Sequence, residues 1–185
     1  LNLVCFHHCG GDASLWREAA QSLVDFKLYA VILPGRSKSK KNELVCSMDE
    51  LADGALSALT VIAGEIPEFS SRPIVFMGHS MGGILAYETL LRLTDMNAQR
   101  PDHLLKVHHL IISSVRSPDK LTNKNMLSKA YPEGHSDWLV HLRSEEGLMD
   151  HVRSLGGATA VDERFVRAKL HAIRGDFAAF ETYTS

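Results

Sequence analysis

Four short apolar runs, rich in β-branched residues and separated by stretches of helical periodicity, constrain the fold of this chain more than any other feature. The runs are "LNLVCF" (1–6), "KLYAVIL" (27–33), "PIVFM" (73–77) and "VHHLIIS" (107–113). Their lack of polar alternation is typical of strands buried on both faces, and therefore of a parallel sheet. Helical patterns lie between them at residues 14–24, 48–66 and 81–95. This alternation predicts an α/β fold built on a doubly wound parallel sheet.

The strand patterns stop near residue 115, and the rest of the chain is amphipathic and helical. The helical patterns lie near residues 119–130, 136–155 and 162–183. Helices inserted after a fourth strand resemble a lid over the carboxyl edge of the sheet. We therefore expect a single domain over residues 1–185, with a sheet core at 1–115 and a helical lid region at 116–185. Because the chain starts inside a strand pattern and ends without a helix stop signal, we expect both of its ends to be cut.

Composition and charge argue against several classes of function. With 45% hydrophobic and 23% charged residues the chain has the make-up of a globular domain, and its formal charge of −2 offers no basic field for nucleic acid. No apolar run reaches the roughly 18 residues that a membrane-spanning helix needs. Cys5, Cys9 and Cys46 show neither a disulfide framework nor metal-ligand spacing, which favours a reducing, cytoplasmic setting. We expect a monomer with no nucleic-acid, membrane or metal partner.

The motif Gly78-His79-Ser80-Met81-Gly82 predicts a catalytic serine. A G-x-S-x-G pattern occurs by chance in roughly one chain in twenty of this length, but here it lies directly after the run 73–77 and directly before a helical pattern. A strand-to-helix turn of this kind holds the serine in a strained conformation, and glycines on either side leave room for it. The turn projects the hydroxyl above the sheet, so Ser80 is the candidate nucleophile. The alternative is a serine that only caps the helix.

Two backbone amides are candidates for an oxyanion hole, which stabilises the negative charge that develops in acyl transfer. The amide of Met81 lies at a helix N-terminus, where the helix dipole favours negative charge. A second donor must come from the loop after an earlier strand, and "HHCGG" follows the first run directly. The amide of Cys9 is therefore the second candidate, and a nucleophilic role for its thiol is not expected.

Other histidines and charged residues have competing interpretations. For His7 and His8 a hydrogen-bonded turn is favoured over a metal site, because adjacent side chains diverge and no second cluster has ligand spacing. His108 and His109 lie within a run that we expect to be buried, which favours a structural role. Residues 37–41 (Ser-Lys-Ser-Lys-Lys) are interpreted as a solvated loop, with docking of an acidic partner as the alternative.

These residues together resemble the type II thioesterases, α/β-hydrolase enzymes that serve polyketide, non-ribosomal peptide and fatty-acid synthases. The family's first strand runs into a segment like C-F-P-H-A-G-G-S-A-S, which this chain matches at Cys5, Phe6, His8, Gly10, Gly11, Ala13 and Ser14. The chain departs from that segment at His7, Cys9 and Asp12. Leu33-Pro34-Gly35-Arg36 matches the family's L-P-G-R, and residues 78–82 match G-H-S-M-G in full. The segment "IRGDFAAFETY" resembles the closing helix of the lid, with Arg174, Asp176, Glu181 and Tyr183.

The resemblance implies an α/β-hydrolase with a helical lid that hydrolyses acyl thioesters. The acyl group would be held on the phosphopantetheine arm of an acyl or peptidyl carrier protein, as part of a megasynthase or beside one. The resemblance also implies no metal and no bound cofactor. Because the oxyanion role uses only a backbone amide, the departure at Cys9 leaves that role intact.

The acid and base that would activate Ser80 are not evident in the sequence. In this fold they follow the nucleophile along the chain. Asp119 lies five residues past Ser114 rather than directly after the fourth strand run, and Asp176 lies in a helical pattern where a structural role is expected. The downstream histidines of the helical region are His135, His141, His151 and His171. The resemblance implies an acid and a histidine after two further strands, and the sequence ends before either. We therefore expect the C-terminal strands of the fold to be missing, the triad Asp and His to lie beyond Ser185, and residues 1–185 alone to be nearly inactive.

The leading hypothesis is a thioesterase in which Ser80 attacks the acyl carbonyl while the amides of Cys9 and Met81 hold the oxyanion. An esterase or acyltransferase on the same fold is a second hypothesis, since fold alone does not separate these reactions. A non-catalytic binding protein that uses the hydrolase fold is a third.

Overall fold

The computed structural model describes residues 1–36, 45–100, 105–118, 139–155 and 163–184. They divide into two units, which are considered separately: residues 1–33 with 48–115, and residues 34–47 with 116–185. Residues 34–47, which the sequence places in the sheet core, therefore group with the helical region. The single-domain organisation stays a prediction.

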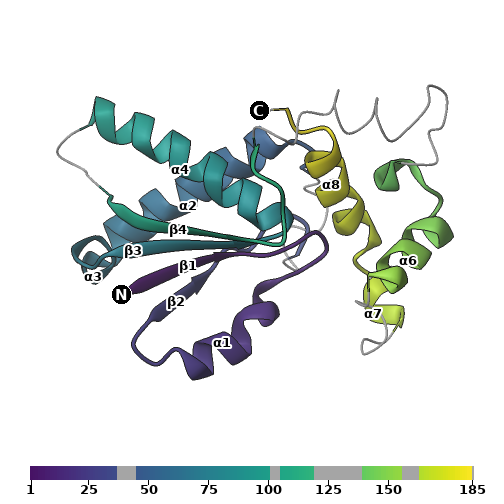
Figure 1. The fold of residues 1–185 in the computed structure, drawn as a ribbon, viewed down its shortest axis with the longest axis horizontal. Helices are drawn as coiled ribbons and strands as arrows, with labels where there is room; N and C mark the ends of the chain where they lie inside the picture. The colour runs from purple at the N-terminus through teal and green to yellow at the C-terminus, as the bar shows by residue number, and fades with distance from the viewer. Residues whose placement is uncertain (37–44, 101–104, 119–138, 156–162, 185) are drawn as a thin grey trace. The chain divides into compact units, whose positions relative to one another are not determined.

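The four apolar runs form the strands of one parallel sheet, as the sequence predicts. They are β1 (Asn2–Phe6), β2 (Lys27–Ala30), β3 (Ile74–His79) and β4 (Val107–Ser113). The spatial order is β2-β1-β3-β4, and every neighbouring pair is parallel. All four strands therefore end at the same edge of the sheet, which is where the loop after β1 and the turn after β3 meet (Figure 1).

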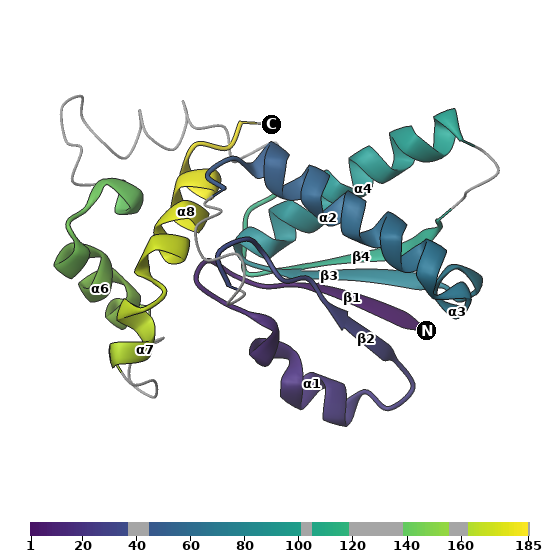
Figure 2. The same cartoon turned by 180° about the vertical axis from the view of Figure 1, so that it is seen from behind.

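Helices cover both faces of this sheet, so the doubly wound prediction is confirmed (Figures 1 and 2). The 3-10 helix η1 (Ala13–Trp16) and α1 (Arg17–Ser22) pack on one face, whereas α2 (Met48–Glu65) and α4 (Met81–Gln99) pack on the other. Alternation along β1 sends side chains to both cores. The core beneath η1 and α1 is built from Leu3, Cys5, Trp16 and Val75. On the α2 and α4 side, the rings of Phe6 and Phe76 meet edge to face with centroids 5.3 Å apart.

Several element bounds differ from those predicted. The second strand ends at Ala30 rather than residue 33, and the helix expected at 14–24 is a 3-10 turn followed by six residues of α-helix. Asp12 initiates that 3-10 turn, because its carboxylate accepts a hydrogen bond from the amide of Ser14 (2.8 Å). The sequence analysis missed a short helix, α3 (Pro67–Ser71), with proline in its first turn.

The expectation that His108 and His109 are buried is wrong for the described structure. Both side chains are exposed, and Ile111 and Ile112 on the same strand are 46% and 37% exposed. The reason is the position of β4, which is the outermost strand of the described sheet and pairs only with β3. An apolar run alone does not distinguish an edge strand from a central one.

The described elements after residue 116 are helices, but they are shorter than the sequence patterns. They are η5 (Val140–Leu142), α6 (Glu145–Ser154), α7 (Glu163–Arg167) and α8 (Leu170–Glu181). The pattern at 136–155 is divided because Ser144 caps a new helix and accepts a hydrogen bond from the amide of Gly147. The pattern at 162–183 breaks between α7 and α8. The helix expected at 119–130, and the loop 37–41, lie outside the described residues.

In the described part of the chain, no helix combines the length and the apolar character that crossing a membrane would require.

Candidate active site

Ser80 occupies the turn between β3 and α4, in a backbone conformation that few residues other than glycine adopt. Its φ and ψ are 54° and −127°, and helix α4 begins at the next residue. A positive φ of this kind costs of order 1–3 kcal/mol and persists only where surrounding contacts enforce it. Here the amide of Ser80 donates to the carbonyl of Ser113 at the end of β4 (2.8 Å). The turn is therefore strained and anchored to the neighbouring strand.

Gly78 and Gly82 are required because the turn brings backbone groups too close for any side chain. A Cβ atom added to Gly78 would collide with the carbonyl group of Gly82, and one added to Gly82 would collide with the carbonyl group of Phe6. The second collision shows that the start of α4 packs directly on the end of β1. Both collisions agree with the inference from the motif that the glycines leave room for the turn. The close approach of Gly82 to Phe6 also explains why the loop after β1 lies beside Ser80.

The two residues proposed to supply oxyanion donors are neighbours. The thiol of Cys9 donates to the thioether sulfur of Met81 across 3.6 Å, so the loop after β1 contacts the first residue of α4. Met81 is fully buried and Cys9 is half-buried. Because the side chain of Met81 is buried, any role of this residue in the site falls to its backbone amide. That amide lies at the helix N-terminus, where partial positive charge favours an anion.

His79 and His8 form a second contact between the same two segments. Their rings meet edge to face with centroids 5.9 Å apart, and Nδ1 of His79 lies 3.2 Å from the hydroxyl of Ser113. Burial, and secondarily the charge of His8, hold the pKa of His79 below its ordinary value of 6.5. A neutral His79 therefore lies directly before the candidate nucleophile and supports the turn.

Ser113 is the supporting residue whose role the sequence did not predict. It is the last residue of β4, close to where the fold would place a carboxylate. Its carbonyl accepts from the amide of Ser80, and its hydroxyl lies within hydrogen-bond distance of His79. The next residue, Ser114, also has a positive φ of 58°. The available signal was the parallel pairing itself, because the register aligns His79 with Ser113.

In the described part of the chain, no hydrogen bond joins the hydroxyl of Ser80 to a histidine. Asp119 and His135, two of the weighed candidates, lie outside the described residues. Three of the other candidates have identifiable partners in the second unit. Asp176 forms a buried ion pair with Arg36, His141 pairs with Glu181 (2.6 Å), and the ring of His151 lies edge-on to Phe177. His171 lies near Gly35, since a Cβ added to that glycine would be 3.7 Å from its Nε2.

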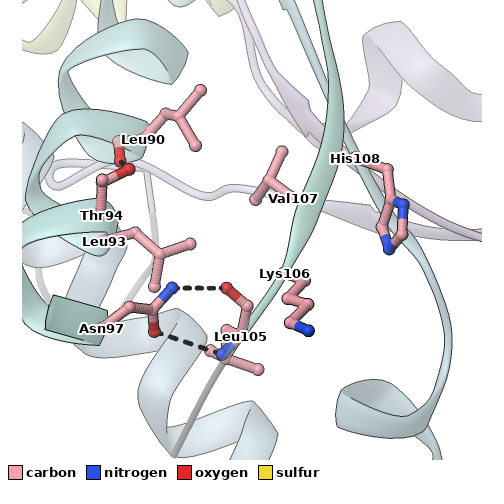
Figure 3. A pocket seen from close by; sticks show the side chains of 8 residues that line it. All are labelled: Leu90, Leu93, Thr94, Asn97, Leu105, Lys106, Val107 and His108. Atoms are coloured by element: carbon pink, nitrogen blue, oxygen red, sulfur yellow. Dashed lines mark hydrogen bonds between the residues drawn. The ribbon is translucent and has the colours of Figure 1, made fainter. Parts of the chain in front are cut away.

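A cavity of about 310 Å³ lies between α4 and β4, away from the turn (Figure 3). It is lined by Leu90, Leu93, Thr94 and Asn97 of α4 and by residues 105–108. The side-chain amide of Asn97 donates to the carbonyl of Leu105 and accepts from its amide, which ties the two elements together. Because this cavity is at the amino end of β4 and Ser113 is at the carboxyl end, it is not the space above Ser80.

The cysteines and possible metal ligands do not form a further site in the described residues. Cys5, Cys9 and Cys46 are all free thiols, and burial raises the pKa of Cys5 to about 12, which makes that thiol inert. No group of three His, Cys, Asp or Glu side chains with metal-binding geometry is found among them.

Two of the known proteins with similar sequences are named as thioesterases. A Streptomyces griseus protein named as a probable cadicidin biosynthesis thioesterase is 31% identical over 188 residues, covering 100% of this chain and 44% of the relative. Thioesterase PikA5 of Streptomyces venezuelae is 28% identical over 190 residues, covering 99% of this chain and 57% of the relative. The chain thus spans about half the length of these two relatives.

Solved structures agree with the sequence relatives. The type II thioesterase BorB from the borrelidin biosynthetic cluster is 31% identical, with a TM-score of 0.74, and the match covers 100% of this chain and 66% of that one. The RedJ thioesterase from the prodiginine pathway of Streptomyces coelicolor is 28% identical with a TM-score of 0.75, over 100% of this chain and 60% of that one. These matches confirm the α/β-hydrolase-type fold and the resemblance to type II thioesterases. The family described as "Thioesterase domain" matches residues 2–185, and the chain belongs to it.

Proposed function

We propose that Ser80 is the nucleophile of an enzyme that hydrolyses acyl thioesters, and that the amides of Cys9 and Met81 form its oxyanion hole. The observation that carries this proposal is the conformation of Ser80, a non-glycine residue with φ of 54° between two glycines that tolerate no side chain. A strained serine at the carboxyl edge of a parallel sheet, at the start of a helix, is the arrangement that presents a hydroxyl to a substrate carbonyl. A serine that only caps a helix does not need this strain.

The proposed reaction proceeds through an acyl-enzyme. Ser80 Oγ attacks the thioester carbonyl and gives its proton to a histidine, and the resulting oxyanion is held by the two amides. The tetrahedral intermediate expels the thiolate, which takes the proton from the histidine and leaves as the thiol. Water then attacks the acyl-serine and gives its proton to the same histidine, which passes it to the departing Ser80 Oγ, so that the carboxylic acid is released and the serine is regenerated. We propose that this histidine and its acid partner lie beyond Ser185. The chemistry needs no metal or bound cofactor.

We further propose that the acyl group arrives on the phosphopantetheine arm of an acyl or peptidyl carrier protein. One related protein is named as a cadicidin biosynthesis thioesterase and another as thioesterase PikA5. The names of BorB and RedJ also refer to biosynthetic pathways. This context supports a biosynthetic megasynthase as the partner. A monomeric state and a cytoplasmic location stay predictions.

The test uses the full-length product of the reading frame. We expect a fluorophosphonate to label it at Ser80 and a decanoyl thioester to be hydrolysed, on N-acetylcysteamine and on a carrier protein. Ser80→Ala is expected to abolish labelling and to lower kcat by up to about 10⁶-fold, as loss of the nucleophile does in serine hydrolases. Labelling without thioester cleavage, but with cleavage of oxygen esters or transfer to an alcohol, would instead support the esterase or acyltransferase. No labelling in a folded protein would support the binding protein.

A further inference from the structure

His7 is a fully buried polar side chain in the loop that carries the candidate oxyanion donor. It follows β1 directly and is 1% exposed. Its Nδ1 lies 2.8 Å from the carbonyl oxygen of His8, and because a carbonyl only accepts, Nδ1 carries the proton and donates. The same carbonyl accepts a second hydrogen bond from the amide of Gly11 (2.9 Å). The oxygen of His8 is therefore held from two directions.

The direction of this oxygen determines the direction of the Cys9 amide. The carbonyl of His8 and the N–H of Cys9 belong to one planar trans peptide, so they point in opposite directions. Fixing the oxygen with His7 and Gly11 consequently fixes the N–H of Cys9 on the other side of the peptide. A rotation of this peptide would turn the donor away and would have to break both hydrogen bonds.

The loop closes tightly around the His7 side chain. A Cβ added to Gly11 would lie 3.0 Å from Cβ of His7 and 3.2 Å from its Nδ1. His8 repeats the pattern one residue later, since its Nδ1 donates to the carbonyl of Cys9 (2.8 Å) and so orients the amide of Gly10 instead. The His7 bond acts, together with that from the Gly11 amide, on the peptide that contains the Cys9 amide, whereas the His8 bond acts on the next peptide.

The other proposed donor is fixed in the same way, but by the backbone alone. The amide of Met81 shares a peptide with the carbonyl of Ser80, and that carbonyl accepts from the amide of Gly83 (2.8 Å). Helix formation therefore orients the Met81 donor without a side chain. The loop after β1 is not helical and has a side chain, that of His7, in the corresponding role.

We propose that His7 is a positioning residue of the oxyanion hole: its Nδ1–H holds the carbonyl of His8 and thereby aims the amide of Cys9 at the oxyanion. The inference rests on the proposed function, since it assigns the Cys9 amide to the transition state. It makes His7 a determinant of kcat rather than of substrate affinity.

The test compares two replacements of His7 in the full-length enzyme. His7→Phe keeps a ring of similar shape without a donor, whereas His7→Asn places a side-chain N–H near the position of Nδ1. Complete loss of an oxyanion donor costs about 10²- to 10³-fold in kcat, so we expect a misdirected one in His7→Phe to cost about 10- to 100-fold, with KM nearly unchanged. His7→Asn is expected to recover most of kcat. His109→Phe, the same change at an exposed histidine of β4, is the matched control.

Two outcomes would overturn the inference. One is a His7→Phe enzyme with the kcat of wild type. The other is an equal loss in His7→Phe and His7→Asn that follows a falling thermal midpoint, which a purely structural role predicts. If His7→Phe does not fold, the ring ¹⁵N shifts of the wild-type protein decide, because an unprotonated Nδ1 of His7 contradicts the inference and a protonated one supports it.

Failure of the proposed function is distinguishable from failure of this inference. If Ser80 is labelled by the fluorophosphonate but no thioester is cleaved, the rate constant of labelling replaces kcat, since the phosphoryl oxygen occupies the oxyanion hole. A rate reduced in His7→Phe and recovered in His7→Asn then supports the role of His7 while the thioesterase proposal fails. Equal labelling rates in the wild type, His7→Phe and His7→Asn would overturn the proposed role of His7.

Discussion

Gly82 and Gly54 both lie in helices, yet an added methyl group meets very different surroundings at the two positions. At Gly82 it collides with the carbonyl group of Phe6, whereas at Gly54 of α2 nothing lies within 4 Å. We therefore expect Gly82→Ala to lower the free energy of unfolding by about 3 kcal/mol, the upper range for overpacking, and to reduce labelling of Ser80. Gly54→Ala is expected to raise the free energy of unfolding by up to about 1 kcal/mol, because alanine is the better helix former.

Chemical denaturation of the two variants beside the wild type measures this difference. Similar stabilities for Gly82→Ala and Gly54→Ala would mean that the start of α4 can move away from β1. In that case the close packing of the turn would not be what holds Ser80 in its conformation.

His79 makes the stability of the turn depend on pH. Burial and the nearby His8 lower its pKa below 6.5, so the unfolded chain binds a proton at a pH where folded His79 does not. Between the lowered pKa and 6.5, the unfolded state gains protons first, and stability therefore falls as the pH falls. His79→Gln removes this contribution, so the loss of stability between pH 7.5 and pH 5 should be smaller than in the wild type. Denaturation at both pH values checks it, and an equal or larger loss in His79→Gln would contradict the assigned cause.

How far the site could be predicted depends on whether a residue acts through a local pattern or through distant contacts. Ser80 and its glycines form a pattern of five residues, and their geometry agrees with the space argument made from it. The role of Ser113 depends on strand pairing with β3, which no local pattern contains. His7 was correctly interpreted as a hydrogen-bonded turn residue. The sequence does not show which peptide this hydrogen bond orients, because that depends on the direction of each peptide plane in the loop.

Among the helices, α8 holds the short turn η5 at both of its ends. The carboxylate of Glu181 accepts from the amides of Val140 (2.8 Å) and His141 (3.1 Å), while the guanidinium of Arg174 donates to the carbonyls of His141 and Arg143 (2.5 and 2.6 Å). The two side chains are seven residues apart and therefore lie on the same face of α8. Each complements the free groups at one end of η5.

We expect Arg174→Met to loosen η5 and α6, because it leaves two carbonyls without their charged donor. Hydrogen bonds to charged groups contribute about 1.5–3 kcal/mol each, which corresponds to local amide exchange faster by about 10- to 100-fold over residues 140–155. Arg153→Met is the matched control, since Arg153 is 40% exposed and its pairs with Asp150 and Glu163 are surface ion pairs. Hydrogen exchange read by mass spectrometry compares the two. Equal protection in Arg174→Met and wild type would show that α8 does not hold η5 through this side chain.

The elements themselves were predicted well where tertiary contacts agree with the local pattern. All four strands form at the predicted runs, and the two long helices begin at the predicted residues 48 and 81. For β1, β3 and these helices the reason is that their apolar faces match the cores they pack against. Errors occurred where contacts override the pattern. The helical pattern at 162–183 continues through residues 168–169 although the helix does not, and β4 has the composition of a central strand at the outermost position of the described sheet.

For the whole molecule, the chemistry around Ser80 is incomplete in the described residues. The described residues provide the proposed nucleophile, its strained turn and the two proposed oxyanion donors, but no hydrogen bond from Ser80 to a histidine. The two relatives compared above are about twice as long as this chain. Without a base the hydroxyl keeps its proton and is a poor nucleophile at neutral pH. Loss of the base costs up to about 10⁶-fold, while the oxyanion hole and binding retain 10³- to 10⁴-fold over water. We therefore expect residues 1–185 to hydrolyse a decanoyl thioester at least about 10⁴-fold more slowly than the full-length product.

Parallel assays of the two proteins test this, with circular dichroism and the thermal midpoint confirming that residues 1–185 are folded under the assay conditions. Adding imidazole discriminates further, because a small external base is expected to restore part of the lost rate if only proton transfer is missing. Ser80→Ala in residues 1–185 should remove the rescued activity. Equal turnover by the two proteins would place the base within residues 1–185. The candidates for the acid and base would then be Asp119, His135 and the other histidines of the helical unit.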